Sequence, residues 1–428
     1  MHKHPTEAPQ KAPPPPPSPA AHDTKKPIPS QGARYVTLLY PLIFFFLFIT
    51  ILVSSLNYET VPWNFFPFPS AKSSNPRVAI CLVGGARRFE LTGPSILEHV
   101  LNVFPEADLF VHSNLDENSF KLGLLRLAPR VTEMRIRRPA MLPETRQQKR
   151  VLTKSFSPNG IQGLLQYFDL VEGCLDMIRE QETQGRFKYD WIVRTRVDVY
   201  WTGPLDLEAF KPGSYVVPEG CRFGGLNDRL GIGDRNTSEA ALSRLSLLPQ
   251  LDEAGFRDLD SETAFRAQLI VNNIPPVELR FPFCILSDRQ YDYPPVRFGV
   301  PVTSMGSPGP LSGAKCRPCT VVCKDECMEQ IGPRVNEMWG WTEWRNGSME
   351  LCNGSQPWEE GWEKIFDNVA GKVAAIVRRR VKNMKFDECV KEMDCLRKKV
   401  ERWNGPDSAE ICNLALLNTP SRTRKLPV

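Results

Sequence analysis

One stretch of the sequence, residues 35–58, constrains everything on either side of it, because it contains no charged side chain and is dominated by Leu, Ile, Phe, Val and Tyr. An α-helix rises about 1.5 Å per residue, so this stretch is long enough to cross the ~30 Å hydrocarbon core of a bilayer. We therefore expect a transmembrane signal-anchor helix. A cleaved signal peptide is the alternative, but its apolar core is normally shorter and does not follow a long polar leader.

The charges that flank this stretch predict its orientation. The downstream flank up to residue 76 holds only Glu59 and Lys72, whereas residues 1–34 carry a basic excess, made by Lys3, Lys11, Lys25, Lys26 and Arg34. Cytosolic flanks are enriched in Lys and Arg, which favours a single-pass type II topology. The proline-rich residues 1–34 then form a disordered cytosolic tail, residues 59–76 form a stem, and the rest of the chain is lumenal.

Two further features agree with an oxidising compartment. The chain has twelve cysteines, which are unusual in the cytosol. Three N-glycosylation sequons, at Asn236, Asn346 and Asn353, all lie on the expected lumenal side. The net charge of +5 is small for a chain of 428 residues, so we expect no nucleic-acid partner.

The first lumenal segment alternates short apolar runs with helical patterns. Residues 77–83, 107–112 and 131–136 read as strands, and residues 161–182 place apolar side chains at helical spacing. The first of these runs ends in Gly84 and Gly85, followed by Arg87. This turn is a candidate phosphate cradle. The alternative is a tight strand-to-helix turn with solvated arginines.

Residues 189–201 form the most informative segment, because an apolar run leads into alternating charged positions. A strand with a period of two would place Arg194, Arg196 and Asp198 on one face. Ligands of open α/β sheets bind at the carboxyl ends of strands, so we interpret this face as an anion site. An internal Arg–Asp salt bridge is the alternative, although one aspartate cannot neutralise two arginines.

These motifs, in this order, resemble lumenal nucleotide-sugar-dependent glycosyltransferases of the GT-A type. The resemblance rests on Gly84-Gly85-x-Arg87, on residues 108–112 and on Arg194-x-Arg196-x-Asp198-x-Tyr200, and it covers residues 77–300. More narrowly, the chain resembles a plant family of type II glycosyltransferase-like membrane proteins. The resemblance implies an α/β fold with a GT-A-like Rossmann-type domain over residues 77–315. It also implies a nucleotide-sugar donor, a glycan or glycoprotein acceptor, and a place in the Golgi membrane.

The resemblance also assigns roles to the charged motif. GT-A enzymes use Asp-x-Asp to hold a divalent ion against the donor diphosphate. Here Tyr200 occupies the place of the second Asp. Asp198 therefore either binds Mn²⁺ or Mg²⁺ or contacts the ribose or sugar of the donor. We expect Arg194 and Arg196 to bind phosphate bidentately, with Arg87 as a weaker phosphate contact and Gly84 and Gly85 lining the donor site.

Two acidic residues are candidates for the base that deprotonates the acceptor hydroxyl. Asp228 follows a glycine-rich loop, and Glu262 follows Asp260 and Ser261 at the expected start of a helix. The alternatives are an Asx-turn for Asp228 and, for Glu262, a first-turn acid favoured by the helix dipole. Arg289 is a further candidate phosphate contact.

The segment 316–428 is predicted to be a small cysteine-rich, mainly helical module. Zinc ligands usually come in pairs separated by a dozen or more residues, and the first four cysteines here are too close together, so disulfides are favoured over zinc. The eight cysteines beyond residue 315 are Cys316, Cys319, Cys323, Cys327, Cys352, Cys389, Cys395 and Cys412. The tryptophans at 339–362 either fill the core of this module or stack on sugars.

Two other kinds of protein remain open at this stage. One is a catalytically degenerate Golgi protein that binds glycans or acts as a scaffold, a possibility raised by Tyr200 at the second motif position. The other is a cell-surface receptor ectodomain, which leaves the charged face of residues 194–198 unexplained. Contacts through the stem and the membrane helix are compatible with a homodimer.

Overall fold

The computed structural model describes residues 76–155, 157, 159–291, 300–331 and 349–416. Residues 74–428 belong to one compact unit, whose described part is mixed α/β. The expected tail and membrane helix lie outside the described residues, as does the stem apart from Pro76. Among the helices that are described, none combines the length and the apolar character needed to cross a bilayer.

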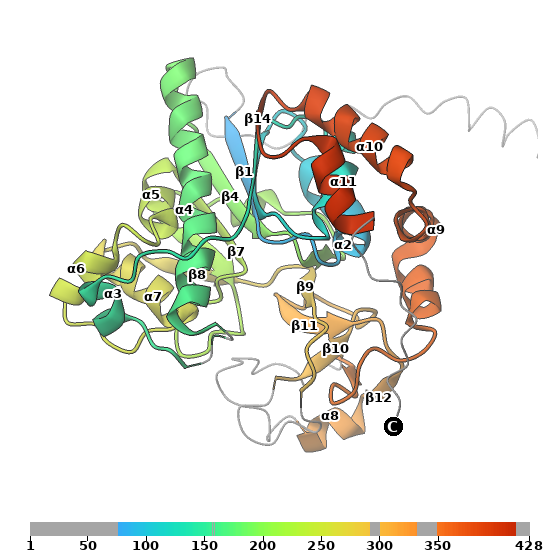
Figure 1. The fold of residues 1–428 in the computed structure, drawn as a ribbon. Helices are drawn as coiled ribbons and strands as arrows, with labels where there is room; N and C mark the ends of the chain where they lie inside the picture. The colour runs from blue at the N-terminus through green and yellow to red at the C-terminus, as the bar shows by residue number, and fades with distance from the viewer. Residues whose placement is uncertain (1–75, 156, 158, 292–299, 332–348, 417–428) are drawn as a thin grey trace, which may run out of the picture. The chain divides into compact units, whose positions relative to one another are not determined.

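An eight-stranded sheet forms the centre of this unit (Figure 1). The five strands from β14 to β4 pair in parallel, β7 is antiparallel to both of its neighbours, and β6 pairs with β8 in parallel. In spatial order the strands are β14 (Arg402–Asn404), β3 (Glu133–Arg137), β2 (Asp108–Asn114), β1 (Val78–Val83), β4 (Trp191–Arg196), β7 (Leu230–Asp234), β6 (Tyr215–Pro218) and β8 (Pro276–Leu279). The predicted α/β fold is confirmed, and its first strands are parallel.

Helices cover both faces of this sheet, because the central strand β1 is apolar on both sides. Its odd-numbered positions Ala79, Cys81 and Val83 pack in a core with residues of α4 (Gly160–Gly185) and α7 (Ser261–Val271). Ile80 and Leu82 belong to the opposite core. That second core includes residues of α2 (Phe89–Ile96), η1 (Leu97–Leu101), η2 (Ser119–Leu127), α10 (Phe386–Lys399) and α11 (Ser408–Leu416).

Shorter helices complete this part of the fold. A separate small core joins α3 (Arg146–Val151), α6 (Leu248–Glu253) and parts of α4 and α7. The helix α5 (Arg235–Leu242) follows β7 directly, and Asp234 caps it by accepting a hydrogen bond from the Thr237 amide. The short 3₁₀ turn η3 (Leu207–Ala209) precedes β6.

A second sheet has six strands, of which all but β5 come from the later part of the chain. Its spatial order is β12 (Val321–Cys323), β13 (Leu351–Cys352), β10 (Val302–Ser304), β11 (Ala314–Arg317), β9 (Phe283–Leu286) and β5 (Val199–Trp201). The helices α8 (Glu326–Ile331) and α9 (Trp362–Lys382) belong to the same region. A core around Cys284, Cys316 and Leu351 holds this sheet together.

Two segments each divide between the two sheets, and the first of them was expected to be a single strand. Residues 189–201 form β4 in the first sheet, turn at residues 197 and 198, and continue as β5 in the second sheet. Residues 277–286 divide in the same way into β8 and β9. The Leu286 amide donates to the Asp198 carbonyl at 3.1 Å, which ties the two crossings together.

The expected boundary between residues 315 and 316 does not separate two packed units. It falls inside β11, and the late strand β14 completes the edge of the first sheet beside β3. The reason is that α10 and α11 bury their apolar sides in the same core as η2 and the first sheet. The C-terminal part also contains strands as well as helices.

Five disulfides are present within the described residues, as the cysteine content predicted. They are Cys81–Cys174, Cys284–Cys316, Cys319–Cys352, Cys323–Cys327 and Cys389–Cys412. The cysteines beyond residue 315 do not pair only with one another, because Cys316 pairs with Cys284 and Cys395 stays outside the five bonds.

Candidate functional site

The first predicted site element is the turn at the carboxyl end of β1. Gly84 has φ 116°, a conformation that favours glycine, and its amide donates to the His112 carbonyl at 3.1 Å. At Gly85 a Cβ atom would come within 3.2 Å of Asp116 Oδ2. Arg87 is exposed beside this turn. The turn therefore leaves its glycines partly exposed at the carboxyl end of β1. The neighbouring acid, Asp116, was not singled out by the sequence analysis.

At the end of β4, Arg196 and Asp198 form a two-pronged ion pair. Arg196 Nε donates to Asp198 Oδ1 at 2.8 Å and Arg196 Nη2 donates to Asp198 Oδ2 at 2.6 Å. Burial opposes the charge on Asp198, but Arg196 outweighs it and holds the pKa of Asp198 below its ordinary value. The salt-bridge alternative is therefore realised for this pair. Both side chains remain partly exposed, at 28% and 23%.

Arg194 lies elsewhere, although it shares a face of β4 with Arg196. It is 1% exposed, and its Nη1 donates to the Asp228 carbonyl and, at 3.4 Å, to the Tyr167 hydroxyl. Arg194 pairs in register with Gly231 of β7, and both are covered by the α4 side of the sheet. The expectation that Arg194 contacts a phosphate is corrected, because in this arrangement it reaches only the protein interior.

Asp228 is the counter-ion of two buried arginines. Its Oδ2 accepts a hydrogen bond from Ser261 Oγ, and its side chain is almost fully buried. Burial raises the pKa of Asp228, but Arg244 and then Arg194 more than offset this, so its pKa is lowered. Arg244 is itself fully buried, with its guanidinium 4.0 Å from the centre of the Phe265 ring. Asp228 is therefore inaccessible to an acceptor and is a positioning residue rather than a base.

Glu262 differs from Asp228 although the two interact. It lies in the first turn of α7, behind the cap residue Asp260, whose side chain accepts a hydrogen bond from the Thr263 amide. Burial, followed by the charge of Asp228, raises the pKa of Glu262 to about 8. Glu262 is partly exposed. A carboxyl with these properties is suited to proton transfer near neutral pH.

The glycine-rich loop before β7 packs directly on the start of α7. The Leu226 amide donates to the Glu262 carbonyl at 3.1 Å. A Cβ atom at Gly225 would lie 2.0 Å from that carbonyl, so only glycine fits there. The loop and the helix start are consequently held as one structure, which brings the two candidate bases, Asp228 and Glu262, close together.

Two basic residues of the site were missed by the sequence analysis. Arg229 follows Asp228 and is 4% exposed, and Lys315 lies half-buried on β11 of the second sheet. Burial, then Arg229 and Arg196, lower the pKa of Lys315 to about 7, whereas Asp198 acts in the opposite direction. Arg289, a predicted phosphate contact, is exposed and also lowers this pKa. The one sequence signal that could have indicated Lys315 is its alternation with Arg317 in a short strand.

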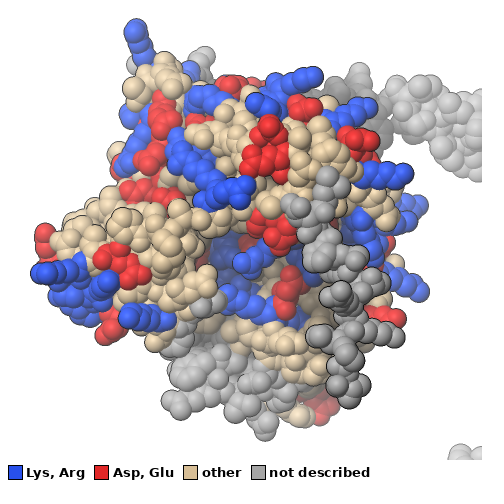
Figure 2. Space-filling model, in the orientation of Figure 1, with Lys and Arg blue, Asp and Glu red and all other residues tan. Residues whose placement is uncertain are grey.

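The charges around the end of β4 are not balanced. Arg196, Arg229 and Lys315 face Asp198, and Glu262 with a pKa of about 8 is largely protonated at neutral pH. Figure 2 shows Lys and Arg side chains gathered in a recess near the middle of this face, with acidic side chains interspersed. The local excess of positive charge favours an anionic ligand.

The divalent ion implied by the GT-A resemblance does not fit these residues. Both carboxylate oxygens of Asp198 are engaged by Arg196. The part of the chain that the structure describes also contains no group of three or more His, Cys, Asp or Glu side chains that could hold a metal. Hard cations such as Mn²⁺ and Mg²⁺ need several oxygen ligands, so no chemical step is assigned to a metal here.

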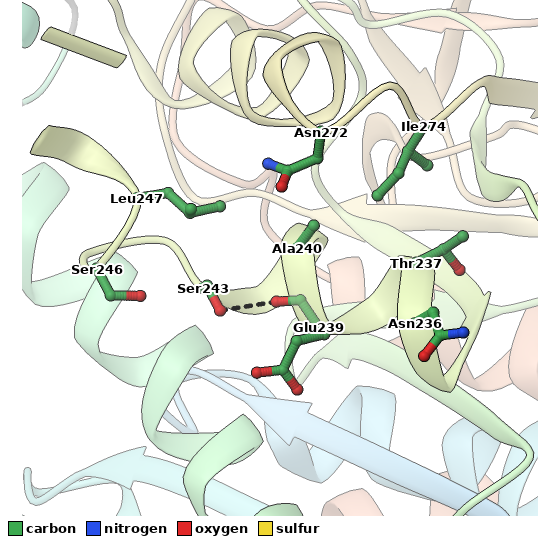
Figure 3. Close-up of a pocket in the computed structure, with 9 residues that line it drawn as sticks. All are labelled: Asn236, Thr237, Glu239, Ala240, Ser243, Ser246, Leu247, Asn272 and Ile274. Atoms are coloured by element: carbon green, nitrogen blue, oxygen red, sulfur yellow. Dashed lines mark hydrogen bonds between the residues drawn. The ribbon is translucent and has the colours of Figure 1, made fainter. Parts of the chain in front are cut away.

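A pocket of about 440 Å³ lies apart from this recess, between α5, the following loop and the end of α7 (Figure 3). Its lining is mostly polar and uncharged, with Glu239 as the single acid among Asn236, Thr237, Ala240, Ser243, Ser246, Leu247, Asn272 and Ile274. None of the predicted donor-site residues lines it. The exposed sequon residue Asn236 belongs to this pocket.

The other sequons and tryptophans divide between described and undescribed parts. Asn353 is exposed, whereas Asn346 lies outside the described residues. Trp358 and Trp362 pack edge to face at 4.8 Å between ring centres, and Arg88 stacks on Trp358 at 4.4 Å. This packing favours the core role over sugar stacking for these two; the tryptophans at 339, 341 and 344 lie outside the described residues.

Comparisons with known proteins bear on most of the chain. The sequence pattern of a family described as "Domain of unknown function (DUF7796)" matches residues 73–418. The chain belongs to this family. No curated protein matches it. Among solved structures, it is similar to the apo form of mouse xyloside xylosyltransferase 1, with 13% sequence identity and a TM-score of 0.32, over 48% of this chain and 85% of that chain.

Proposed function

We propose that the protein is a glycosyltransferase that moves a sugar from a nucleotide-sugar donor to a hydroxyl of a glycan or glycoprotein. In this proposal it is a single-pass type II protein of the Golgi membrane, with residues 77–428 in the lumen. The observation that carries the proposal is the excess of positive charge around Arg196, Arg229 and Lys315, where β4 ends. Nucleotide sugars carry a diphosphate, and open α/β sheets bind such ligands at the carboxyl ends of their strands.

The side chains take distinct roles in this proposal. Arg196 and Arg229 contact the diphosphate, with the Gly84–Gly85 turn and Arg87 at the rim of the same site. Glu262, once deprotonated, removes the proton of the acceptor hydroxyl. The acceptor oxygen then forms a bond to the anomeric carbon, the bond from that carbon to the phosphate oxygen breaks, and the nucleoside diphosphate leaves with the electron pair. Asp198 orients Arg196.

Equilibrium binding tests this proposal directly. Purified protein is titrated with a panel of nucleotide sugars and nucleoside diphosphates, and the melting temperature and heat of binding are measured. A ligand at about 100 times its Kd stabilises the fold by roughly 2.7 kcal/mol. Stabilisation by one nucleotide class, together with release of its nucleoside diphosphate in the presence of acceptor glycans, is expected. Absence of binding by every nucleotide in the panel would contradict the proposal.

A second candidate function is a nucleotide- or glycan-binding protein without transferase activity. It is favoured by one observation: of the acids that the sequence analysis proposed, Asp228 is buried and Asp198 is paired, which leaves Glu262 with a pKa of about 8. This candidate predicts nucleotide binding without release of free sugar or product at any pH between 6 and 9. A rate of donor turnover that depends on Glu262 would rule it out.

A further inference from the structure

Arg229 lies on the loop that precedes β7 and interacts with Asp198 and Lys315 at the end of β4. A Cβ atom at Gly313, the residue before β11, would come within 3.1 Å of Arg229 Cδ, so this side chain crosses the start of β11. Its Nη1 donates to the Cys221 carbonyl at 3.4 Å and to Asn227 Oδ1 at 3.5 Å. Its Nε has no hydrogen-bond partner among the described residues, although Arg229 is 4% exposed. A buried guanidinium N–H without an acceptor is unfavourable. The Nε atoms of Arg194 and Arg244 also lack a partner in the described part of the chain, but Arg229 differs from both because it interacts with Asp198 and with Lys315 of the second sheet, so a ligand oxygen bound between these groups would satisfy it.

Lys315 belongs to the second sheet and interacts with the same charged groups. It pairs in register with Ile285 of β9, and Ile285 pairs with Val199 of β5, the residue after Asp198. Residues opposite one another on neighbouring strands lie on the same face of a sheet, so Lys315 shares a face with Val199, and the turn that holds Asp198 directly precedes Val199. Lys315 is half-buried, and it forms no salt bridge within the described ranges of the chain. Its ammonium group is thus held among Arg196, Arg229 and Asp198 without a dedicated counter-ion.

Arg229 and Lys315 both interact with Asp198, whose carboxylate is not available to a metal. Asp198 is saturated by Arg196, so the three basic residues exceed the negative charge beside them. In enzymes that use a divalent ion, the ion neutralises the departing diphosphate. Here Arg196, Arg229 and Lys315 lie at the carboxyl end of β4, where such an ion would be expected. The guanidinium groups of the two arginines match phosphate oxygens in geometry.

We propose that Lys315, Arg229 and Arg196 bind the diphosphate of the donor directly and without a divalent cation, with Lys315 of the second sheet in the position of charge that a metal would occupy. This inference rests on the proposed function. It assigns the second sheet a direct part in donor binding. It also gives the recess a ligand class, a nucleoside diphosphate, that is recognised through its phosphates.

The test measures binding of UDP, GDP and inorganic pyrophosphate to the full chain in detergent, once with excess EDTA and once with excess Mn²⁺. We expect one of the nucleotides to bind with a Kd that differs by less than about twofold between the two conditions. Lys315→Met is expected to weaken binding by about tenfold or more in EDTA, and Lys315→Arg to retain it. Lys324→Met, which removes an exposed lysine near α8, is the matched control and should leave the Kd unchanged.

The outcomes separate this inference from the proposed function. Nucleotide binding that requires Mn²⁺, or that Lys315→Met leaves intact, overturns the metal-free site and leaves the transferase proposal standing. Binding of pyrophosphate in EDTA that depends on Lys315, with no preference for any nucleotide, supports the cation site and removes the transferase proposal. An unchanged melting temperature of unliganded Lys315→Met excludes loss of folding as the cause of weaker binding.

Discussion

Asp228 and Glu262 interact at the start of α7 and hold opposite protonation states at neutral pH. Burial raises the pKa of both, but Arg244 and Arg194 lower that of Asp228, so Asp228 stays ionised. The charge of Asp228 then adds to burial and raises the pKa of Glu262 to about 8. The buried arginine pair thus sets the protonation state of the partly exposed glutamate through Asp228.

If Glu262 is the base, donor turnover requires its deprotonated form. We expect the rate at saturating substrate to rise about tenfold per pH unit below pH 8 and to level off above it. Glu262→Gln should reduce turnover by roughly 10²-fold or more and leave the Kd of the nucleoside diphosphate nearly unchanged. A pH–rate profile with a matched titration of binding checks both. A variant that turns over as fast as the native protein would remove Glu262 from the reaction.

Asp228→Asn should both destabilise the protein and shift this profile. It leaves Arg194 and Arg244 buried without their counter-ion, for which a loss of about 3–5 kcal/mol in unfolding free energy is typical. It also removes the like charge beside Glu262, so the rise in activity should move to lower pH. Urea unfolding and the pH–rate profile measure the two effects. Asp176→Asn, in an exposed ion pair on α4, is the control and should change stability by less than about 1 kcal/mol.

Diphosphate binding should weaken as pH rises through the pKa of Lys315. Because the pKa of Lys315 is lowered to about 7, binding an anion above pH 7 requires uptake of a proton by this lysine. The affinity should therefore fall by up to about tenfold per pH unit above pH 7 and be flat below it, after correction for the ligand's own titration. Lys315→Arg, which keeps its charge, should abolish the dependence. A native Kd that is constant from pH 6 to 9 would contradict it.

The bond Cys284–Cys316 links β9 to β11 and thereby supports the strand that carries Lys315. Replacing both cysteines by alanine should lower the unfolding free energy by roughly 2–4 kcal/mol and weaken diphosphate binding. The bond Cys323–Cys327 closes a separation of 4 residues rather than 32, so its removal should have a smaller effect on both quantities. If the two replacements weakened diphosphate binding equally, the conclusion that β11 supports the binding site would be wrong.

The topology proposal predicts glycans on the exposed sequons. Asn236→Gln and Asn353→Gln should each remove one glycan and increase electrophoretic mobility in the untreated protein. After enzymatic removal of N-glycans the native protein and both variants should migrate together. Absence of any shift in the native protein upon this treatment would contradict a lumenal position for residues 77–428.

Local pattern was sufficient for the elements that are continuous in sequence. Apolar runs predicted β1 and β2, and three- and four-residue spacing predicted α4, because these elements bury side chains of a single sequence stretch. It was insufficient at residues 189–201, where alternation continues unbroken through a turn that transfers the chain from one sheet to the other. Nothing in the side-chain pattern distinguishes one long strand from two that belong to different sheets.

The same limit explains the errors at the site. Periodicity correctly placed Arg194 and Arg196 on one face of β4. The packing of α4 and β7 shows that Arg194 is covered by the protein whereas Arg196, two residues later, is partly exposed. Lys315 was missed because it is far from the motif in sequence and was assigned to a separate module, whereas sheet pairing brings it near Asp198.

The edge strand β14 has a consequence for how the chain reaches its native state. Residues 402–404 are among the last of the described chain to leave the ribosome, and until they arrive β3 presents an unpaired edge. Open edges recruit other strands and promote aggregation, and N-terminal parts begin to fold during synthesis. A chain that lacks β14 would keep this edge of β3 open, so we expect such a truncation to aggregate more readily than the full chain.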